Sequence, residues 1–445
     1  MSCFLRHILC TALLTAAGAG AAGAQLLGQL SLPPVGVPAP LGGVPVAGPV
    51  LQDVLGSPQV QQQVVRPTLD TVQGLPQGLA EAGGSTLADL RKMRLEELIR
   101  ENRDVLEADD RGQPARRGVL IVVDPDPTSL QLATRAGFAV AGQDVEPALG
   151  MRVVKLAVPS RMNLREAIRR VRTVAPQLQV DYDHVFEPAG GSLIPFAATL
   201  ASVAGAGSGH LVGMIDGGVA SHPSLRGTAI EQNGFAGAPK PTGHGTAVAS
   251  LLVGNQGPFR GAANGAKLYV ADVYGGSRAA GSASAIVPAL GWLASHRAQV
   301  INISLVGPQN AIVARAIDAV RRRGILVVAA VGNDGPAAPP QYPASYSGVI
   351  AVTAVDARGH VLPEAGKATH LDFAAPGADM AAALPGQGYA RVRGTSFAAP
   401  LTAGRLLLAG SPDRLAAEAQ RGSGRIGRGL VCFECRVDPA TVGAK

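Results

Sequence analysis

The stretch LVGMIDGG, residues 211–218, indicates the fold class. A continuous apolar run of this length is typical of a strand that is buried on both faces, as in a parallel sheet. Two glycines directly after Asp216 allow the chain to turn sharply at the end of that strand. Ligand and catalytic groups of open α/β sheets gather at the carboxyl ends of strands, so the pattern predicts Asp216 as a site residue. A turn residue at a strand end is the alternative interpretation.

Two further motifs supply an imidazole and a hydroxyl. TGHGT, residues 242–246, places His244 between glycines at the start of a predicted helix that Gly254 ends. GTSFAAP, residues 394–400, places Ser396 where a glycine-led turn enters an apolar helix. A serine hydroxyl needs a neighbouring base to remove its proton and an oriented acid to stabilise the charged base. We therefore predict Ser396 as nucleophile, His244 as base and Asp216 as acid. A surface histidine and a buried helix start rich in small residues are the alternatives.

An oxyanion also needs hydrogen-bond donors, and the sequence offers two. GILVVAAVGN, residues 324–333, predicts a buried strand that ends in Gly-Asn, so the amide of Asn333 is one candidate. The other is the backbone N–H of Ser396, at the amino end of its helix. We expect Pro400 to lie in the first turn of that helix, where it disturbs no intrahelical hydrogen bond. A helix cap or turn former is the alternative for Asn333.

The order Asp, His, Ser along the chain, together with these motifs, resembles the subtilisin family (subtilases) of serine endopeptidases. The resemblance covers about residues 208–430, and 300–305 is similar to the family's substrate-pairing edge strand. It implies a doubly wound α/β fold with a mostly parallel sheet. It also implies peptide-bond hydrolysis through an acyl-enzyme on Ser396. A catalytically idle subtilase fold, used as a binding or chaperone module, is the alternative.

The resemblance assigns substrate binding to Ser304, Leu305, Val306 and Gly307. The family usually has glycine where this chain has Val306. A stiff, branched side chain there is expected to narrow the pocket for the residue before the scissile bond. We therefore expect cleavage after alanine or other small residues in preference to phenylalanine or tyrosine.

No cofactor or metal is expected. The family commonly carries an acidic calcium ligand shortly after the catalytic aspartate, where this chain has Ser224. The loop before Gly261 is also short, whereas calcium prefers six to eight oxygen ligands. The chain is therefore not expected to form a high-affinity calcium site.

Residues 1–24 resemble a signal peptide, with a basic residue, an apolar stretch and small residues before a cleavage point after Ala24. The apolar stretch is short for a membrane anchor, so the mature chain is expected to carry none and to be secreted or periplasmic. Residues 25–84 are rich in proline and glycine and predict an extended tether. Export favours a disulfide between Cys432 and Cys435. A redox dithiol and a zinc site are the alternatives for this pair.

Residues 85–190 predict a charged helix, which starts at Ser85, and then a small domain. Its elements follow the order strand, helix, strand, strand, helix, strand, as in ferredoxin-like α+β folds. An independent binding module is one interpretation. Its place before the predicted catalytic domain, residues 191–445, resembles the propeptide that assists folding and inhibits subtilases. That resemblance implies autocleavage between about Phe186 and Gly209.

Composition limits the partners. Apolar residues make up 47% of the 445 and charged residues 16%, which supports a large core. The net charge of +7 does not indicate nucleic-acid binding, because the basic residues are scattered and only 4% of residues are aromatic. The expected partners are polypeptide substrates and the chain's own propeptide.

Overall fold

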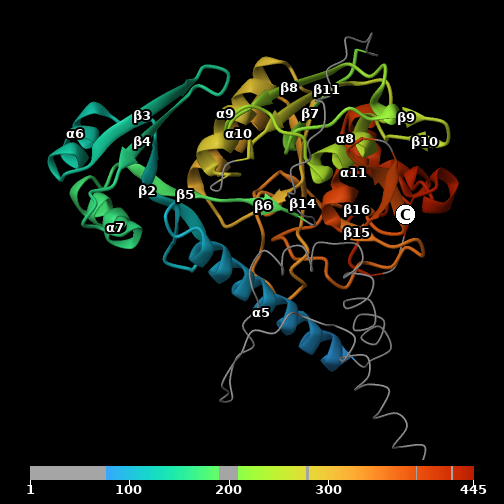
Figure 1. Cartoon of the computed structure of the whole chain (residues 1–445), viewed down its shortest axis with the longest axis horizontal. Helices are drawn as coiled ribbons and strands as arrows, with labels where there is room; N and C mark the ends of the chain where they lie inside the picture. The colour runs from blue at the N-terminus through green and yellow to red at the C-terminus, as the bar shows by residue number, and fades with distance from the viewer. Residues whose placement is uncertain (1–76, 190–208, 277–279, 387, 422–423, 445) are drawn as a thin grey trace, which may run out of the picture. The chain divides into compact units, whose positions relative to one another are not determined.

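The computed structural model describes residues 77–189, 209–276, 280–386, 388–421 and 424–444. The predicted signal peptide and most of the predicted tether lie outside these residues. Two sheets are relevant to the site (Figure 1). One is antiparallel and is formed by residues 106–184, and the other is parallel and is formed by residues 211–376.

Among the described residues, seven parallel strands form the larger sheet in the order β16-β15-β14-β12-β7-β11-β8. The strands are β7 Leu211–Asp216, β8 Ile230–Gly234, β11 Lys267–Asp272, β12 Val300–Ile303, β14 Leu326–Ala330, β15 Ile350–Val355 and β16 Phe373–Pro376. The strand order reverses direction at β7, which lies between β11 and β12. Asp216, the last residue of β7, therefore lies at the kind of switch point where α/β sheets place their sites.

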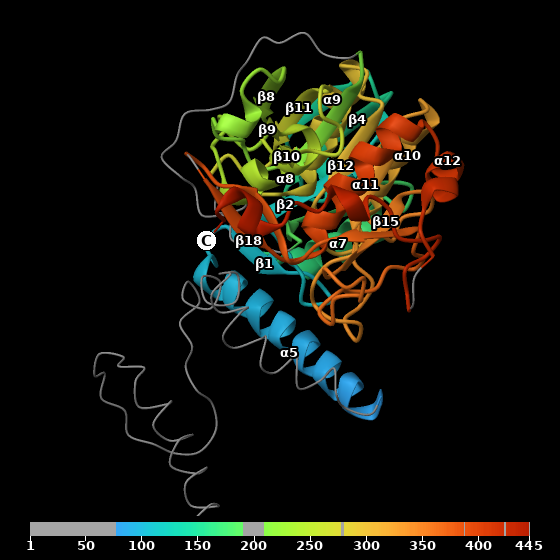
Figure 2. The ribbon, with the colours of Figure 1, turned by 90° about the vertical axis from the view of Figure 1, so that its right-hand side faces the viewer.

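Helices cover both faces of this sheet. The helices α8 Gly243–Val253 and α11 Thr395–Ala409 lie together on one face (Figure 2). The helices α9 Ala283–Ser295 and α10 Ala311–Arg322 lie together on the other. Side chains of β7 alternate between the two cores, as a strand requires: Met214 packs with the first pair of helices and Ile215 with the second. The predicted doubly wound α/β fold is confirmed.

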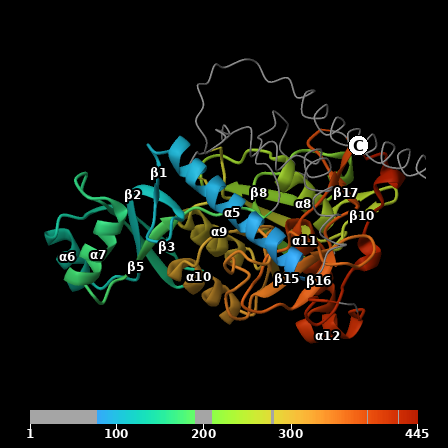
Figure 3. The same ribbon diagram turned by 90° about the horizontal axis from the view of Figure 1, so that it is seen from below.

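The antiparallel sheet has the predicted ferredoxin-like order β5-β2-β4-β3, with β1 beside β2. Its elements are β1 Leu106–Ala108, β2 Pro114–Val123, α6 Pro127–Arg135, β3 Ala139–Glu146, β4 Met151–Ala157, α7 Leu164–Val174 and β5 Gln179–His184. One face of the sheet packs with α6 and α7, and Leu120 and Val122 lie in that core. Ile121 and Val123, on the opposite face, pack in the core of α9 and α10 (Figure 3).

Helix α5, Gln77–Glu101, begins before the predicted start at Ser85. The helix continues through Gly83 and Gly84, which were assigned to the tether. Glycine costs an interior helix position about 1 kcal/mol without preventing a helix, so the helix can continue through this pair.

The remaining elements are short. They are β6 Glu187–Pro188, β9 Asn255–Gln256, β10 Phe259–Arg260, β13 Leu305–Val306, β17 Met380–Ala383, β18 Tyr389–Val392, α12 Pro412–Glu418 and single 3-10 turns at Pro223–Leu225, Phe433–Cys435 and Pro439–Val442. Within the described part of the chain, no helix combines the length and apolar character that a membrane span needs.

Candidate active site

Asp216 and His244 form a buried pair. The Nδ1 atom of His244 lies 2.9 Å from Oδ1 of Asp216, and the N–H of Gly217 donates to the same oxygen at 2.7 Å. His244 lies in the first turn of α8, whose start is capped by Thr242, which accepts from the N–H of Gly245 at 2.9 Å. An ionised carboxylate can only accept, so Nδ1 carries the proton and Nε2 is left as the acceptor.

Ser396 lies at the start of α11, after Gly394, whose φ of 136° is one that favours glycine. The ring of Phe397, the next residue, lies 5.4 Å from the His244 ring, measured between centroids. Both Oγ of Ser396 and Nε2 of His244 are buried, and neither has a hydrogen-bond partner among the described residues. The contact of Phe397 with His244 brings the start of α11 to the imidazole, and no hydrogen bond joins Ser396 Oγ to His244 Nε2; such catalytic hydrogen bonds often form only when substrate binds.

Pro400 lies beyond the first turn of α11, so the expected position was wrong. A proline inside a helix deprives the carbonyl four residues earlier, here that of Ser396, of its donor. The hydroxyl of Ser304 replaces that donor at 2.9 Å. Asn302 in turn donates from Nδ2 to the Ser304 hydroxyl at 2.9 Å. The Ser304 side chain thus supports the backbone of Ser396. Sequence reasoning missed Asn302, because the register of β12 decides which side chains meet.

Asn333 follows β14 and is held at both ends of its amide. Its Oδ1 accepts from the N–H of Thr395 at 2.9 Å, while its Nδ2 donates to the carbonyl of Ala189. The N–H of Gly332 donates to the Thr395 hydroxyl at 3.1 Å. Because Thr395 fixes the amide oxygen, the NH₂ group is directed at Ala189. Thr395 was not predicted, although its place next to Ser396 was a usable signal.

Residues 186–189 lie along the site as an extended segment. The strand β6 pairs with β13 in antiparallel register. On either side of this pair, Ala189 donates its N–H to the carbonyl of Ser304 and Phe186 donates to that of Gly281, both at 2.9 Å. Addition of an extended segment to a free strand is a common mode of peptide recognition.

The structure divides the stretch 300–305, which was expected to form a single edge strand. The strand β12 is interior, because it pairs with β14 on one side and with β7 on the other. Only the separate strand β13 has an edge that the large sheet leaves open, and β6 pairs there. Leu305 and Val306 form β13, Ser304 contributes its carbonyl, and Gly307 lies under Phe186. A side chain at Gly307 would meet the Phe186 ring at 2.4 Å.

Val306 is buried and faces the turn that leads to Asn333. Its Cγ1 lies 3.3 Å from the position that a Cβ at Gly332 would take. Ala189 packs in the same core cluster and is 2% exposed.

Asp272 is a buried acid that sequence reasoning missed, although it ends the apolar run 268–271. In the sheet register it lies beside Asp216. Its carboxylate accepts from the N–H groups of Lys240, Tyr274 and Gly275 at 2.7, 2.8 and 3.0 Å. Burial raises the pKa of Asp272, and the nearby Asp216 adds to the rise. Asp272 thus anchors two loops next to the Asp216–His244 pair.

Ser224 stands where the resemblance places an acidic calcium ligand. Ser224 is buried, and its hydroxyl lies 2.7 Å from Nδ1 of His222.

Cys432 and Cys435 are joined by a disulfide. With Glu434 they form the cluster of metal-ligating groups found among the described residues, but disulfide sulfurs are not thiolate ligands.

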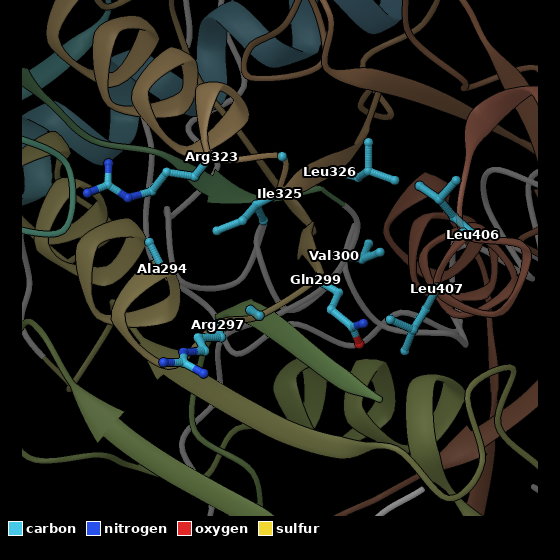
Figure 4. A pocket seen from close by; sticks show the side chains of 12 residues that line it. Ala294, Arg297, Gln299, Val300, Arg323, Ile325, Leu326, Leu406 and Leu407 are labelled. Atoms are coloured by element: carbon cyan, nitrogen blue, oxygen red, sulfur yellow. The ribbon is translucent and has the colours of Figure 1, made fainter. Parts of the chain in front are cut away.

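A pocket of about 480 Å³ lies at the amino ends of β12 and β14 (Figure 4). Val300 and Leu326, the first residues of those strands, line it together with Leu406 and Leu407 near the end of α11. It is thus at the opposite edge of the sheet from Asp216 and does not belong to this site.

An acid, an imidazole, a serine and an amide donor gathered at one sheet edge can carry out nucleophilic acyl transfer. Comparison with known proteins agrees with this chemistry. The family model described as "Subtilase family" matches residues 207–417. Subtilisin Savinase of Lederbergia lenta is 37% identical over 207 residues, which cover 45% of this chain and 76% of that protein. The alkaline protease of Alkalihalobacillus alcalophilus is 37% identical over 207 residues, which cover 45% of this chain and 54% of that protein.

The fold is also found in fervidolysin from Fervidobacterium pennivorans, described as a keratinolytic enzyme related to subtilisin. The TM-score is 0.59 at 21% identity, over 72% of this chain and 61% of that one. The chain belongs to the subtilase family of serine endopeptidases.

Proposed function

We propose that this subtilase is exported as an inhibited precursor and that it cleaves itself after Ala189. The proposal is carried by one observation: the Ala189 carbonyl, in a segment paired with β13, accepts from the amide of Asn333. Export is supported by the signal-like segment 1–24 and by the disulfide, which forms in oxidising compartments.

In the proposed reaction His244 takes the proton of the Ser396 hydroxyl, whose Oγ attacks the carbonyl carbon of Ala189. The carbonyl oxygen becomes an oxyanion, stabilised by Asn333 Nδ2 and the N–H of Ser396. His244 then gives its proton to the nitrogen of Gly190, which leaves as the new amino terminus. Water, deprotonated by His244, hydrolyses the acyl-enzyme and frees Ser396. Asp216 stabilises the imidazolium throughout.

The antiparallel domain has the contacts expected of an inhibitor that stays bound. Asp183 accepts from the N–H and the hydroxyl of Ser284, at 2.8 and 2.7 Å, at the start of α9. Asp181 accepts from the N–H of Ala311, at 2.7 Å, at the start of α10. Carboxylates at helix amino ends satisfy free N–H groups and complement the helix dipole. Two acids of β5 thus cap two helices of the catalytic part.

Protein purified from an expression culture should begin at Gly190 and should take up one fluorophosphonate, on Ser396. Amino-terminal sequencing and mass mapping of the labelled peptide measure both. A His244→Ala variant and heat-denatured wild type are controls that should not label. A purified protein that starts at Gly190 yet never labels would support the idle-fold alternative, and a start elsewhere would contradict the proposed bond.

Replacing Val306 by glycine should widen the accepted range of residues before the scissile bond. A pocket wall discriminates by about 1–3 kcal/mol for each methylene-sized step, so cleavage after phenylalanine should rise by about 10-fold or more. Cleavage after alanine is the internal control and should change little. A peptide library varied at that position measures both. A wild type that already cleaves best after phenylalanine, tyrosine or leucine would show that Val306 does not limit the pocket.

A further inference from the structure

Helix α5 contacts Asp334, in the turn after β14, through two arginines. Nε of Arg91 lies 3.0 Å from Oδ2 of Asp334, and Nη2 of Arg94 lies 3.2 Å from Oδ1 of the same carboxylate. Asp334 directly follows Asn333, and its side chain is 7% exposed. Each of its oxygens is thus held by one cation from α5.

The same Arg94 nitrogen also binds Glu187, in the extended segment 186–189. Nη2 lies 3.3 Å from Oε2 of Glu187, so one cation is shared by two carboxylates. Burial opposes the charge of Arg94, but Glu187 and Asp334 outweigh this effect and hold its pKa above the ordinary value. Two carboxylates this close would repel each other if the cation were absent.

Glu187 and Asp334 are joined through Arg94, whose Nη2 lies within 3.3 Å of both carboxylates. Two residues after Glu187, Ala189 presents its backbone carbonyl to Asn333, the residue before Asp334. If Ala189 occupies P1, the position before the scissile bond, Glu187 occupies P3, two residues earlier.

Cleavage after Ala189 would separate both arginines from the catalytic part, because α5 precedes the bond. Asp334 stays with the enzyme as a carboxylate at the P3 position, and its partners among the described residues, Arg91 and Arg94, leave with the propeptide. A carboxylate that has lost its cationic partners gains from a new one.

We infer that Asp334 makes the mature enzyme select substrates with lysine or arginine at P3, and that Arg94 takes the place of that side chain in the precursor. The inference rests on the proposed function. A lysine or arginine at the position of Glu187 carries its charge toward Asp334 on a side chain longer than that of glutamate, and can take over the contact that Arg94 makes. A glutamate there is accommodated best while α5 is docked, which makes α5 part of the inhibitor.

The test uses mature enzyme and three peptides that copy residues 185–192, with Glu187 retained or replaced by glutamine or lysine. We expect kcat/KM to fall in the order lysine, glutamine, glutamate, with about tenfold between the extremes, because attraction favours one and repulsion disfavours the other. High salt should reduce this ratio. Asp334→Asn should bring the three rates together. Asp318→Asn removes one charge from the exposed surface of α10 and should keep the wild-type ratio.

Equal hydrolysis of the three peptides by the wild type would overturn this inference and leave the proposed function standing. A lysine preference that persists in Asp334→Asn would also overturn it, since another group would then provide the selectivity. Failure of the wild type to hydrolyse any of the peptides would instead contradict the proposed function, and this inference with it. If Asp334→Asn does not accumulate, the lysine-to-glutamate ratio of kcat/KM for the wild type is measured at low and high salt. A ratio that salt does not reduce would overturn the inference.

Discussion

Replacing Ser396 by alanine is expected to abolish peptide hydrolysis and to leave the precursor uncleaved. The methyl group has no oxygen to attack the Ala189 carbonyl, so no acyl-enzyme can form. Loss of a nucleophile of this kind lowers kcat by about 10⁶-fold. Because Ser396 Oγ has no hydrogen-bond partner among the described residues, its removal should leave the fold intact. The measurement is the mass of the protein made in a protease-deficient host, together with casein hydrolysis.

Ser295→Ala is the matched control. That serine ends α9, is exposed, and donates to the carbonyl of Trp292 at 2.7 Å, remote from the triad. This variant should mature as the wild type does. Normal trimming of Ser396→Ala in the same host would show that another protease cuts the precursor and would refute self-processing.

Replacing Asn333 by alanine is expected to lower turnover by about 10²–10³, the usual loss for one oxyanion donor. The effect should fall on kcat with little change in KM, because the donor binds the charge that develops in the transition state. Self-cleavage of the precursor should slow in parallel. Steady-state kinetics on one peptide substrate measure both constants.

Asn333 accepts from the backbone N–H of Thr395 and so helps to hold the turn, which the Gly332–Thr395 hydrogen bond also holds; loss of this order has to be separated from loss of the donor. Thr395→Val keeps the Asn333 donor and removes the hydroxyl that accepts from Gly332. It should lower kcat far less than Asn333→Ala. Equal losses in the two variants would mean that Asn333 only orders the turn, and an unchanged rate in Asn333→Ala would exclude it from the reaction.

The elements around the site could be predicted because their signals are local. The apolar run before Asp216 forms β7, the glycines around His244 open α8, and the glycine before Ser396 starts α11. The helix α5 was predicted with the wrong start, and Pro400 was placed in the wrong turn. For Pro400 the Ser304 hydroxyl replaces the lost donor, and the linear sequence does not show which group does so.

The amino-acid sequence by itself determined the α/β class, the order Asp216, His244, Ser396 and the ferredoxin-like pattern before them. These follow from hydrophobic periodicity and from turns made by a few adjacent residues. Only the tertiary structure decided that Ala189 meets Asn333, and that Arg94 joins Glu187 to Asp334. Such contacts join residues far apart in the chain and hold over about 3 Å, so a shift of one residue in strand register would break them.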